Sequence, residues 1–209
     1  MQQHLNLFVT QFVTLYALLE PIGHLSLFVA LTGEQTVSER RRLAVLSVGF
    51  AFLILVFFAV LGQALLHAMG ISILSFQIAG GLILFAFSLT MIFSEPKRPT
   101  GLSDDKTLTA LAIYPLATPT IAGPGAILSV VLLSDNNRHS YLDQGVTVAV
   151  VAAMMAVLLL TFLAGDYITR VIGSSGTNLV RRIMGIVIAA FSVDVVLTAM
   201  ARWLHLPPI

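Results

Sequence analysis

The sequence contains no cysteine and very little charge. Without cysteine, the chain has no disulfide, no thiol nucleophile and no thiolate metal ligand. Only 10% of its 209 residues are charged, whereas a soluble domain carries about 25%. The formal net charge of +1 leaves no basic surface that would neutralise many phosphates, which argues against a nucleic-acid partner.

The usual catalytic and nucleotide-binding motifs are also missing. The sequence has no HExxH, no GxSxG and no phosphate-binding glycine loop. His67, His139 and His205 are too widely scattered to form a metal site, which needs convergent ligands. We therefore expect neither enzyme activity nor a cofactor or metal.

Hydrophobic residues dominate what is present. They make up 57% of the chain, and the mean hydropathy is +0.96, more than a soluble fold of this size can bury. At roughly 20 residues per span, the chain has room for about six membrane-spanning helices. Six apolar runs of suitable length are present, at residues 7–31, 43–66, 71–93, 108–133, 145–165 and 183–204.

The cationic residues assign the links between these runs to two sides of a membrane. Of the eleven Lys and Arg, all but Arg138 and Arg202 fall in the first, third and fifth links. These nine are Arg40, Arg41, Arg42, Lys97, Arg98, Lys106, Arg170, Arg181 and Arg182. Because Lys and Arg near span ends are retained on the cytoplasmic side, six spans place both termini on the non-cytoplasmic side.

The first and fourth runs are each interrupted near the middle by helix-breaking residues. The first contains Glu20-Pro21-Ile22-Gly23-His24, and the fourth contains Thr118-Pro119-Thr120 followed by Gly123-Pro124-Gly125. Proline lacks an amide proton and pushes the preceding residue out of helical geometry, so carbonyl groups are left without partners. Lipid offers none, and unwound backbone is tolerated only where it lines a cavity or packs within protein.

Helices that restart after Gly23 and Gly125 would turn free amides and the positive end of a half-helix toward a carboxylate. The alternative is that the prolines and glycines only kink the helices for packing. Two breaks at corresponding positions favour a functional role.

A weak internal repeat relates the two halves. Shifting the chain by 98 residues, the difference between 21 and 119, places Pro21 on Pro119, and Ile78-Ala79-Gly80 resembles Ile183-Met184-Gly185. A three-span unit enters the membrane from the opposite side in its second copy, because an odd number of crossings reverses direction.

The predicted fold is therefore an all-α membrane protein. Its six transmembrane helices form two inverted three-helix repeats, with broken helices in spans one and four. The repeats cover residues 1–93 and 108–209, and a cytoplasmic linker at 94–107 joins them. Interrupted spans at corresponding positions of inverted halves are typical of a transporter's binding site near the bilayer midplane.

Three ionisable residues fall inside the predicted spans, where each is costly unless it faces a cavity or a partner. Glu20 is positioned either to bind a substrate ammonium or coupling proton, or to cap backbone amides. His24 either pairs with Glu20 and titrates, or is a satisfied polar group. We favour Asp194, near the middle of the last run, as a cavity residue over a role in helix packing.

Several short motifs together resemble the MarC family of integral membrane proteins. They are Glu20-Pro21-Ile22-Gly23, Gly70-Ile71-Ser72 leading to Ile78-Ala79-Gly80-Gly81, Pro115-Leu116-Ala117-Thr118-Pro119 followed by Ala122-Gly123-Pro124-Gly125, and Arg182-Ile183-Met184-Gly185. The resemblance covers nearly the whole chain. It implies a six-span inner-membrane protein of two inverted repeats, some members of which transport small neutral amino acids such as glycine and alanine.

The sequence thus predicts a secondary transporter that moves small neutral amino acids across the inner membrane by alternating access. The candidate substrate-binding residues are Glu20, Pro21, Gly23, His24, Ser26, Thr118, Pro119, Thr120, Gly123, Pro124, Gly125 and Asp194. The expected partners are an amino acid, the lipid bilayer and H⁺ or Na⁺ as coupling ion. The alternatives are an exporter or channel for another small solute, or a membrane protein without transport activity.

Gly80, Gly81 and Gly185 are expected to let helices approach closely rather than to contact substrate.

Overall fold

A computed structural model describes residues 2–33, 35–94, 107–134 and 141–206, and every element in these ranges is a helix. The first half of the chain forms α1 (Gln2–Leu19), α2 (Pro21–Thr32), α3 (Val37–Ala68) and α4 (Ile73–Phe93). The second half forms α5 (Leu108–Leu111), the π-helical segment η1 (Ala112–Ile121), α6 (Pro124–Leu133), α7 (Tyr141–Leu163) and α8 (Gly165–Trp203). Most of the predicted 94–107 linker, with Lys97, Arg98 and Lys106, lies outside the described residues, as do Arg138 and His139.

The described helices fit a membrane protein with several spans. Five stretches are long and apolar enough to cross a bilayer: Leu5–Val29, Val37–Ala68, Ile73–Phe93, Gln144–Leu163 and Gly176–Trp203. Leu108–Ile121 and Pro124–Leu133 add a sixth if this pair, bent by 61°, is counted as one broken span. The all-α membrane class predicted from the sequence is confirmed, with five or six candidate spans.

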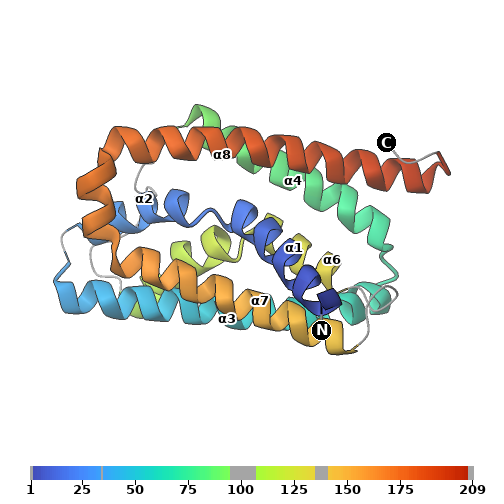
Figure 1. Ribbon diagram of the computed structural model, residues 1–209, viewed down its shortest axis with the longest axis horizontal. Helices are drawn as coiled ribbons and strands as arrows, with labels where there is room; N and C mark the ends of the chain where they lie inside the picture. Colours follow the sequence, from blue (N-terminus) through green and yellow to red (C-terminus); the bar gives the residue numbers. More distant parts are fainter. Residues whose placement is uncertain (1, 34, 95–106, 135–140, 207–209) are drawn as a thin grey trace.

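The helices lie in two layers (Figure 1). In one layer α3 and α7 lie side by side and run in opposite directions, and α1 packs against α7. In the other layer α4 and α8 form an antiparallel pair. Helices α2 and α6 contact both layers, so the segments that follow the two breaks connect them.

The apolar core lies within the first layer and around the breaks. Leu19, Leu55, Leu116 and Leu158, from four different segments, are all fully buried in one cluster. Burying a leucine side chain stabilises a water-soluble fold by about 1.5–3 kcal/mol, but lipid is itself apolar, so here close packing replaces that driving force.

Glycines bring α4 and α8 into close contact, as expected for Gly81 and Gly185. A Cβ added to Gly81 would lie 2.6 Å from Cγ2 of Val196, and one added to Gly185 would lie 3.0 Å from Cβ of Met91. Each helix therefore places a glycine against a larger residue of the other.

The same reciprocal pattern joins α4 to α6. Leu128 of α6 lies over Gly80 of α4, where an added Cβ would be 2.8 Å from Cδ2 of the leucine. Leu84 of α4 lies over Gly125 of α6 in the same way. The close-packing role expected for Gly80 is confirmed, and Gly125 shares it.

Two predicted links are helical instead. The fifth link, residues 166–182, was expected to be a loop, but α8 already begins at Gly165 and is interrupted only at Gly173 (φ 70°, ψ 169°). Glycine adopts this positive φ without the clash that a Cβ would cause, so the helix changes direction there and resumes.

The first link is shortened by a capping box. The Thr36 hydroxyl accepts a hydrogen bond from the backbone amide of Glu39 (3.3 Å), and the Glu39 carboxylate accepts one from the backbone amide of Thr36 (2.8 Å). This pairing satisfies two free amides and starts α3 at Val37, so Arg40, Arg41 and Arg42 are helical.

Candidate functional site at the two broken helices

The first break is a single residue, Glu20, between α1 and α2. Its backbone is left-handed (φ 38°, ψ 69°), a conformation that costs about 1–2 kcal/mol for a residue with a Cβ. Its amide donates to the carbonyl of Tyr16 (3.2 Å), and its carbonyl accepts the amide of His24 (3.1 Å). Pro21 is the first residue of α2, where a missing amide proton does no harm. The helix thus restarts at Pro21, not after Gly23 as expected.

The second break is wider than the sequence indicated. Tyr114 (φ −134°, ψ 122°) and Thr118 (φ −130°, ψ 132°) are both extended, and each precedes a proline. The residue before a proline is biased away from helical geometry, and both departures agree with this bias. After Gly123, which is also extended, α6 begins at Pro124, so the break covers Tyr114 to Gly123 rather than Thr118 to Gly125.

The half-helices α2 and α6 begin alike. Each has a proline in its first turn, and neither has a side-chain hydrogen bond at its N-cap residue. The amides at a helix start carry partial positive charge, so both starts favour an anionic group nearby.

A small cavity joins the two breaks. Its lining residues come from span one, span four and α4: Leu18, His24, Leu84, Phe87, Pro119, Thr120, Ile121, Gly123, Pro124, Gly125 and Ala126. The volume open to the centre of a water molecule is about 20 Å³. Because a water needs about 10–15 Å³ by this measure, the cavity holds a water but not an amino acid as it stands.

Half of the twelve predicted site residues line this cavity. They are His24, Pro119, Thr120, Gly123, Pro124 and Gly125. Glu20, Pro21 and Gly23 lie at the first break, between the lining residues Leu18 and His24 along the chain, but do not line the cavity themselves. Thr118 is an exposed residue of the second break. Ser26 lies in α2, but its side chain is outside the described part of the structure.

Glu20 and His24 are both buried in the first break. Glu20 is 4% exposed, and its Oε1 has no hydrogen-bond partner among the described residues. Its Oε2 lies over Gly23, where an added Cβ would be 2.7 Å away. Burial dominates the electrostatics of this carboxyl group, and the positive charge of Arg181 on α8 acts on it as a second, weaker influence. A buried carboxylate oxygen with no partner is a place for a donor such as water or an ammonium group.

Arg181 also holds the neighbouring helix end. Its guanidinium donates to the carbonyls of Ser94 (2.7 Å) and Thr90 (3.3 Å), the last acceptors of α4. Cationic donors stabilise helix C-termini in this way. Arg181 therefore links α8 to the end of α4.

Asp194 is not brought to the cavity. It is exposed on α8, and the lining residues of the cavity come from other segments. The spacing along the chain gave no information on which way the helix face that carries Asp194 turns.

Two buried amides are candidates that the sequence analysis did not select. Gln11 of α1 is 1% exposed, and neither atom of its side-chain amide has a partner among the described residues; Oε1 of Gln77 in α4 also lacks one. The sequence did contain a signal for both residues, because each is a side-chain amide within a mostly apolar run. Leu84 and Phe87 of α4 were also missed, because only the fold brings that helix to the breaks.

These features define a polytopic α-helical membrane protein with a cavity between two broken spans. The MarC family integral membrane protein model matches residues 5–204, and the chain belongs to this family. Among its relatives, each called a UPF0056 membrane protein, that of Buchnera aphidicola subsp. Schizaphis graminum is 31% identical over 90% of this chain and 89% of its own. The Aquifex aeolicus protein is 32% identical over 95% of this chain and 94% of its own. The Methanocaldococcus jannaschii protein is 31% identical over 93% and 86%, respectively. No solved structure matches the chain.

Proposed function

We propose that this protein is a secondary transporter that moves small neutral amino acids, such as glycine or alanine, across the inner membrane. The observation that carries the proposal is the cavity shared by both broken spans, which His24 lines from one side and Pro119 to Gly125 from the other. Interrupted spans of this kind expose backbone to a solute in known transporter folds.

The arrangement of the helices supports two inverted repeats, residues 1–93 and 108–209. The pairs α3 and α7, and α4 and α8, run antiparallel in contact, as equivalent spans of inverted halves would (Figure 1). By their role as first-turn prolines, Pro21 corresponds to Pro124 rather than to Pro119. The repeat offset at the break is then 103 residues (124 minus 21), instead of the 98 inferred from the sequence.

The charges support an orientation with both termini on the non-cytoplasmic side. Arg40 and Arg41 lie near the start of α3, Arg170 lies near the start of α8, and Arg181 contacts Ser94 at the end of α4. These three helix ends lie toward the same end of the molecule (Figure 1). Under the positive-inside rule that end is cytoplasmic. The coupling ion is H⁺ or Na⁺, for which Glu20 is the buried carboxylate at the site.

The chemistry of the two breaks is compatible with this substrate class and supports it. An amino acid offers an ammonium group that pairs with Glu20 and a carboxylate that suits the start of a half-helix. A short side chain suits a site walled by Leu84, Phe87 and Ile121. Because the present cavity is smaller than the substrate, the halves must separate on one side to admit it, as alternating access requires.

The test is uptake of radiolabelled glycine and alanine by vesicles containing the purified protein. Gly123→Ala is the informative variant, because its Cβ would lie 2.5 Å from the carbonyl oxygen of Pro119 and would distort the second break. Gly49→Ala is the matched control, since an added Cβ there has nothing within 4 Å. We expect uptake by the wild type and Gly49→Ala proteins and loss in Gly123→Ala. Absence of flux in the wild type under H⁺ and Na⁺ gradients, or normal flux in Gly123→Ala, would reject the proposal.

A further inference from the structure

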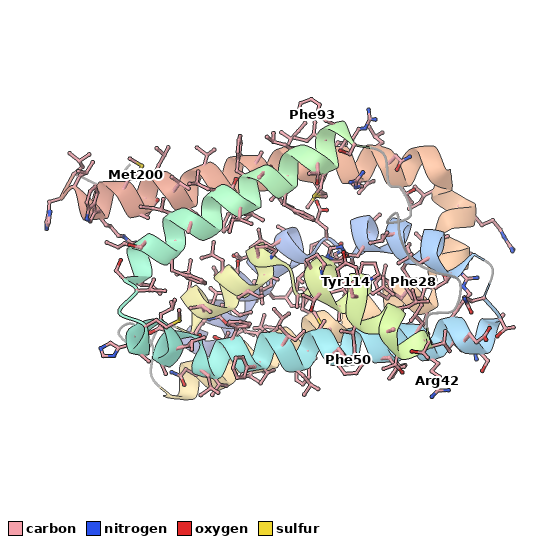
Figure 2. All side chains as sticks on the ribbon, turned by 180° about the vertical axis from the view of Figure 1, so that it is seen from behind. Phe28, Arg42, Phe50, Phe93, Tyr114 and Met200 are labelled. Atoms are coloured by element: carbon pink, nitrogen blue, oxygen red, sulfur yellow. The ribbon has the colours of Figure 1, made fainter. Side chains whose placement is uncertain are left out.

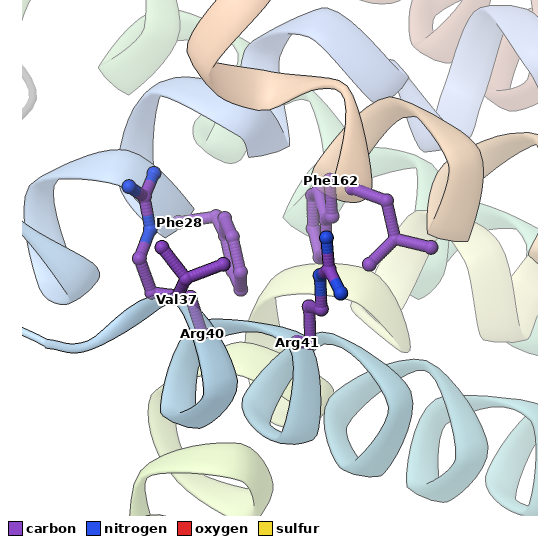
Figure 3. A pocket seen from close by; sticks show the side chains of 6 residues that line it. Phe28, Val37, Arg40, Arg41 and Phe162 are labelled. Carbon is purple, nitrogen blue, oxygen red and sulfur yellow. The ribbon is translucent and has the colours of Figure 1, made fainter.

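A second, larger pocket lies away from the breaks, where the ends of α2, α3 and α7 meet. Its volume is about 100 Å³, against about 20 Å³ for the cavity at the breaks. It is lined by Phe28, Val37, Arg40, Arg41, Phe162 and Leu163 (Figure 3). None of these residues lines the cavity at the breaks.

The polar half of the pocket is cationic. Arg40 and Arg41 are consecutive residues near the start of α3, and their side chains extend from the helix toward α2 and α7 (Figure 3). Their acidic neighbour Glu39 is not a lining residue, and its carboxylate is held by the amide and hydroxyl of Thr36 (2.8 and 2.7 Å). The Glu39 carboxylate is therefore engaged at the start of α3 and does not line the pocket.

The other half of the pocket is apolar and open at the rim. The rings of Phe28 and Phe162 are stacked with centroids 4.4 Å apart and are almost fully buried. Val37 and Leu163 are 62% and 47% exposed. A site for a free, water-soluble anion has no need of exposed aliphatic side chains beside its cations.

The length of α3 places the pocket at the membrane surface. At about 1.5 Å per residue its 32 residues extend about 48 Å, whereas the hydrocarbon core is about 30 Å thick. The apolar run of α3 begins only after Arg42, so the first turns of this helix, with Arg40 and Arg41, are the part that lies in the headgroup layer. Phosphate groups of lipids occupy this layer.

We propose that this pocket binds an anionic phospholipid, with the headgroup phosphate at Arg40 and Arg41 and the adjoining acyl chain against Val37 and Leu163. Arginine matches phosphate because its planar guanidinium donates two parallel hydrogen bonds. Basic pockets between spanning helices on the cytoplasmic side suit anionic headgroups.

The test compares lipid binding by two variants of the full chain. In the double variant Arg40→Gln, Arg41→Gln, both cations of the pocket are removed. Arg42→Gln is the matched control, because Arg42 is the next residue of the same helix, is exposed and extends away from the pocket (Figure 2). Phosphatidylglycerol and phosphatidylcholine are titrated into detergent-solubilised protein and bound lipid is counted by native mass spectrometry.

We expect wild type protein to prefer phosphatidylglycerol, and the double variant to bind it about thirtyfold more weakly. Arg42→Gln should stay within about twofold of wild type, because the Arg42 side chain extends away from the pocket and does not line it. Leu163→Gln should weaken lipid binding while leaving the protein folded, since Leu163 is exposed.

Three results would overturn the proposal. The first is unchanged phosphatidylglycerol binding in the double variant. The second is an equal loss of binding in Arg42→Gln, which would indicate diffuse electrostatic attraction. The third is displacement of the lipid by millimolar inorganic phosphate, which would indicate a site for the free ion. Circular dichroism of each variant identifies any that fails to fold. If the double variant is unfolded, the single variants Arg40→Gln and Arg41→Gln are measured instead, and equal binding to wild type in both overturns the proposal.

Discussion

At the scale of single residues, Glu20 combines three unusual features: a left-handed backbone, burial and a carboxylate oxygen without a described partner. A residue with a Cβ is rarely held in this conformation unless its surroundings enforce it. The sequence indicated the break through Pro21 but not the conformation, because a proline constrains its predecessor without choosing among the non-helical regions.

Glu20→Gln is expected to lower amino acid uptake by roughly tenfold to a hundredfold, because hydrogen bonds to a charged group contribute about 1.5–3 kcal/mol. The substitution keeps the shape of the side chain and removes its capacity to ionise. Uptake is measured in vesicles with equal amounts of inserted protein. Asp194→Asn is the control, since Asp194 is exposed outside the cavity, and its uptake should remain within about twofold of wild type. The reverse ranking of the two variants would return Asp194 to the site.

Gln11→Leu is expected to raise the stability of the protein or leave it unchanged. The buried amide of Gln11 has no partner among the described residues, and leaving such a group unpaired costs about 1–3 kcal/mol. Thermal unfolding in detergent measures the effect. A clear fall in melting temperature would mean that the amide is bound to water or a ligand in the folded protein.

At the scale of helices, the sequence predicted both broken spans and the positions of α4 and α7 to within a few residues. Apolar runs are set by the thickness of the bilayer, so they are easily found. The helical link at 166–182 was missed because polar residues outside the hydrocarbon are compatible with either a loop or a helix. The placement of α4 beside the breaks depends on packing between distant segments and could not be read from the chain.

Gly81→Ala is expected to destabilise the protein by about 1–3 kcal/mol, because its Cβ would lie 2.6 Å from Val196 in the α4–α8 contact. Gly49→Ala on α3 adds a Cβ that has nothing within 4 Å, so it should be neutral or should stabilise the protein by up to about 1 kcal/mol through helix propensity. Both are compared by thermal unfolding in the same detergent. Equal stability of the two variants would show that α4 and α8 separate easily.

At the scale of the whole molecule, the alternation of charge gives a direct test of orientation. Because the chain has no cysteine, a single introduced cysteine reports its own side of the membrane. With a membrane-impermeant maleimide, His205→Cys should be labelled in intact cells, and Arg42→Cys only after the cells are opened. Labelling in the opposite order would invert the proposed topology.

The reciprocal contacts between α4 and α6 restrict how the two halves can move. Leu84 of α4 packs over Gly125 of α6, and Leu128 of α6 packs over Gly80 of α4. The two helices therefore interlock along their contact. A displacement of α6 parallel to α4 would drive both leucines into neighbouring side chains, whereas a tilt that parts the helices clears them together. In the proposed transport cycle, α4 and α6 should therefore separate by tilting rather than by sliding, and a crosslink between them should hold the protein in a single state.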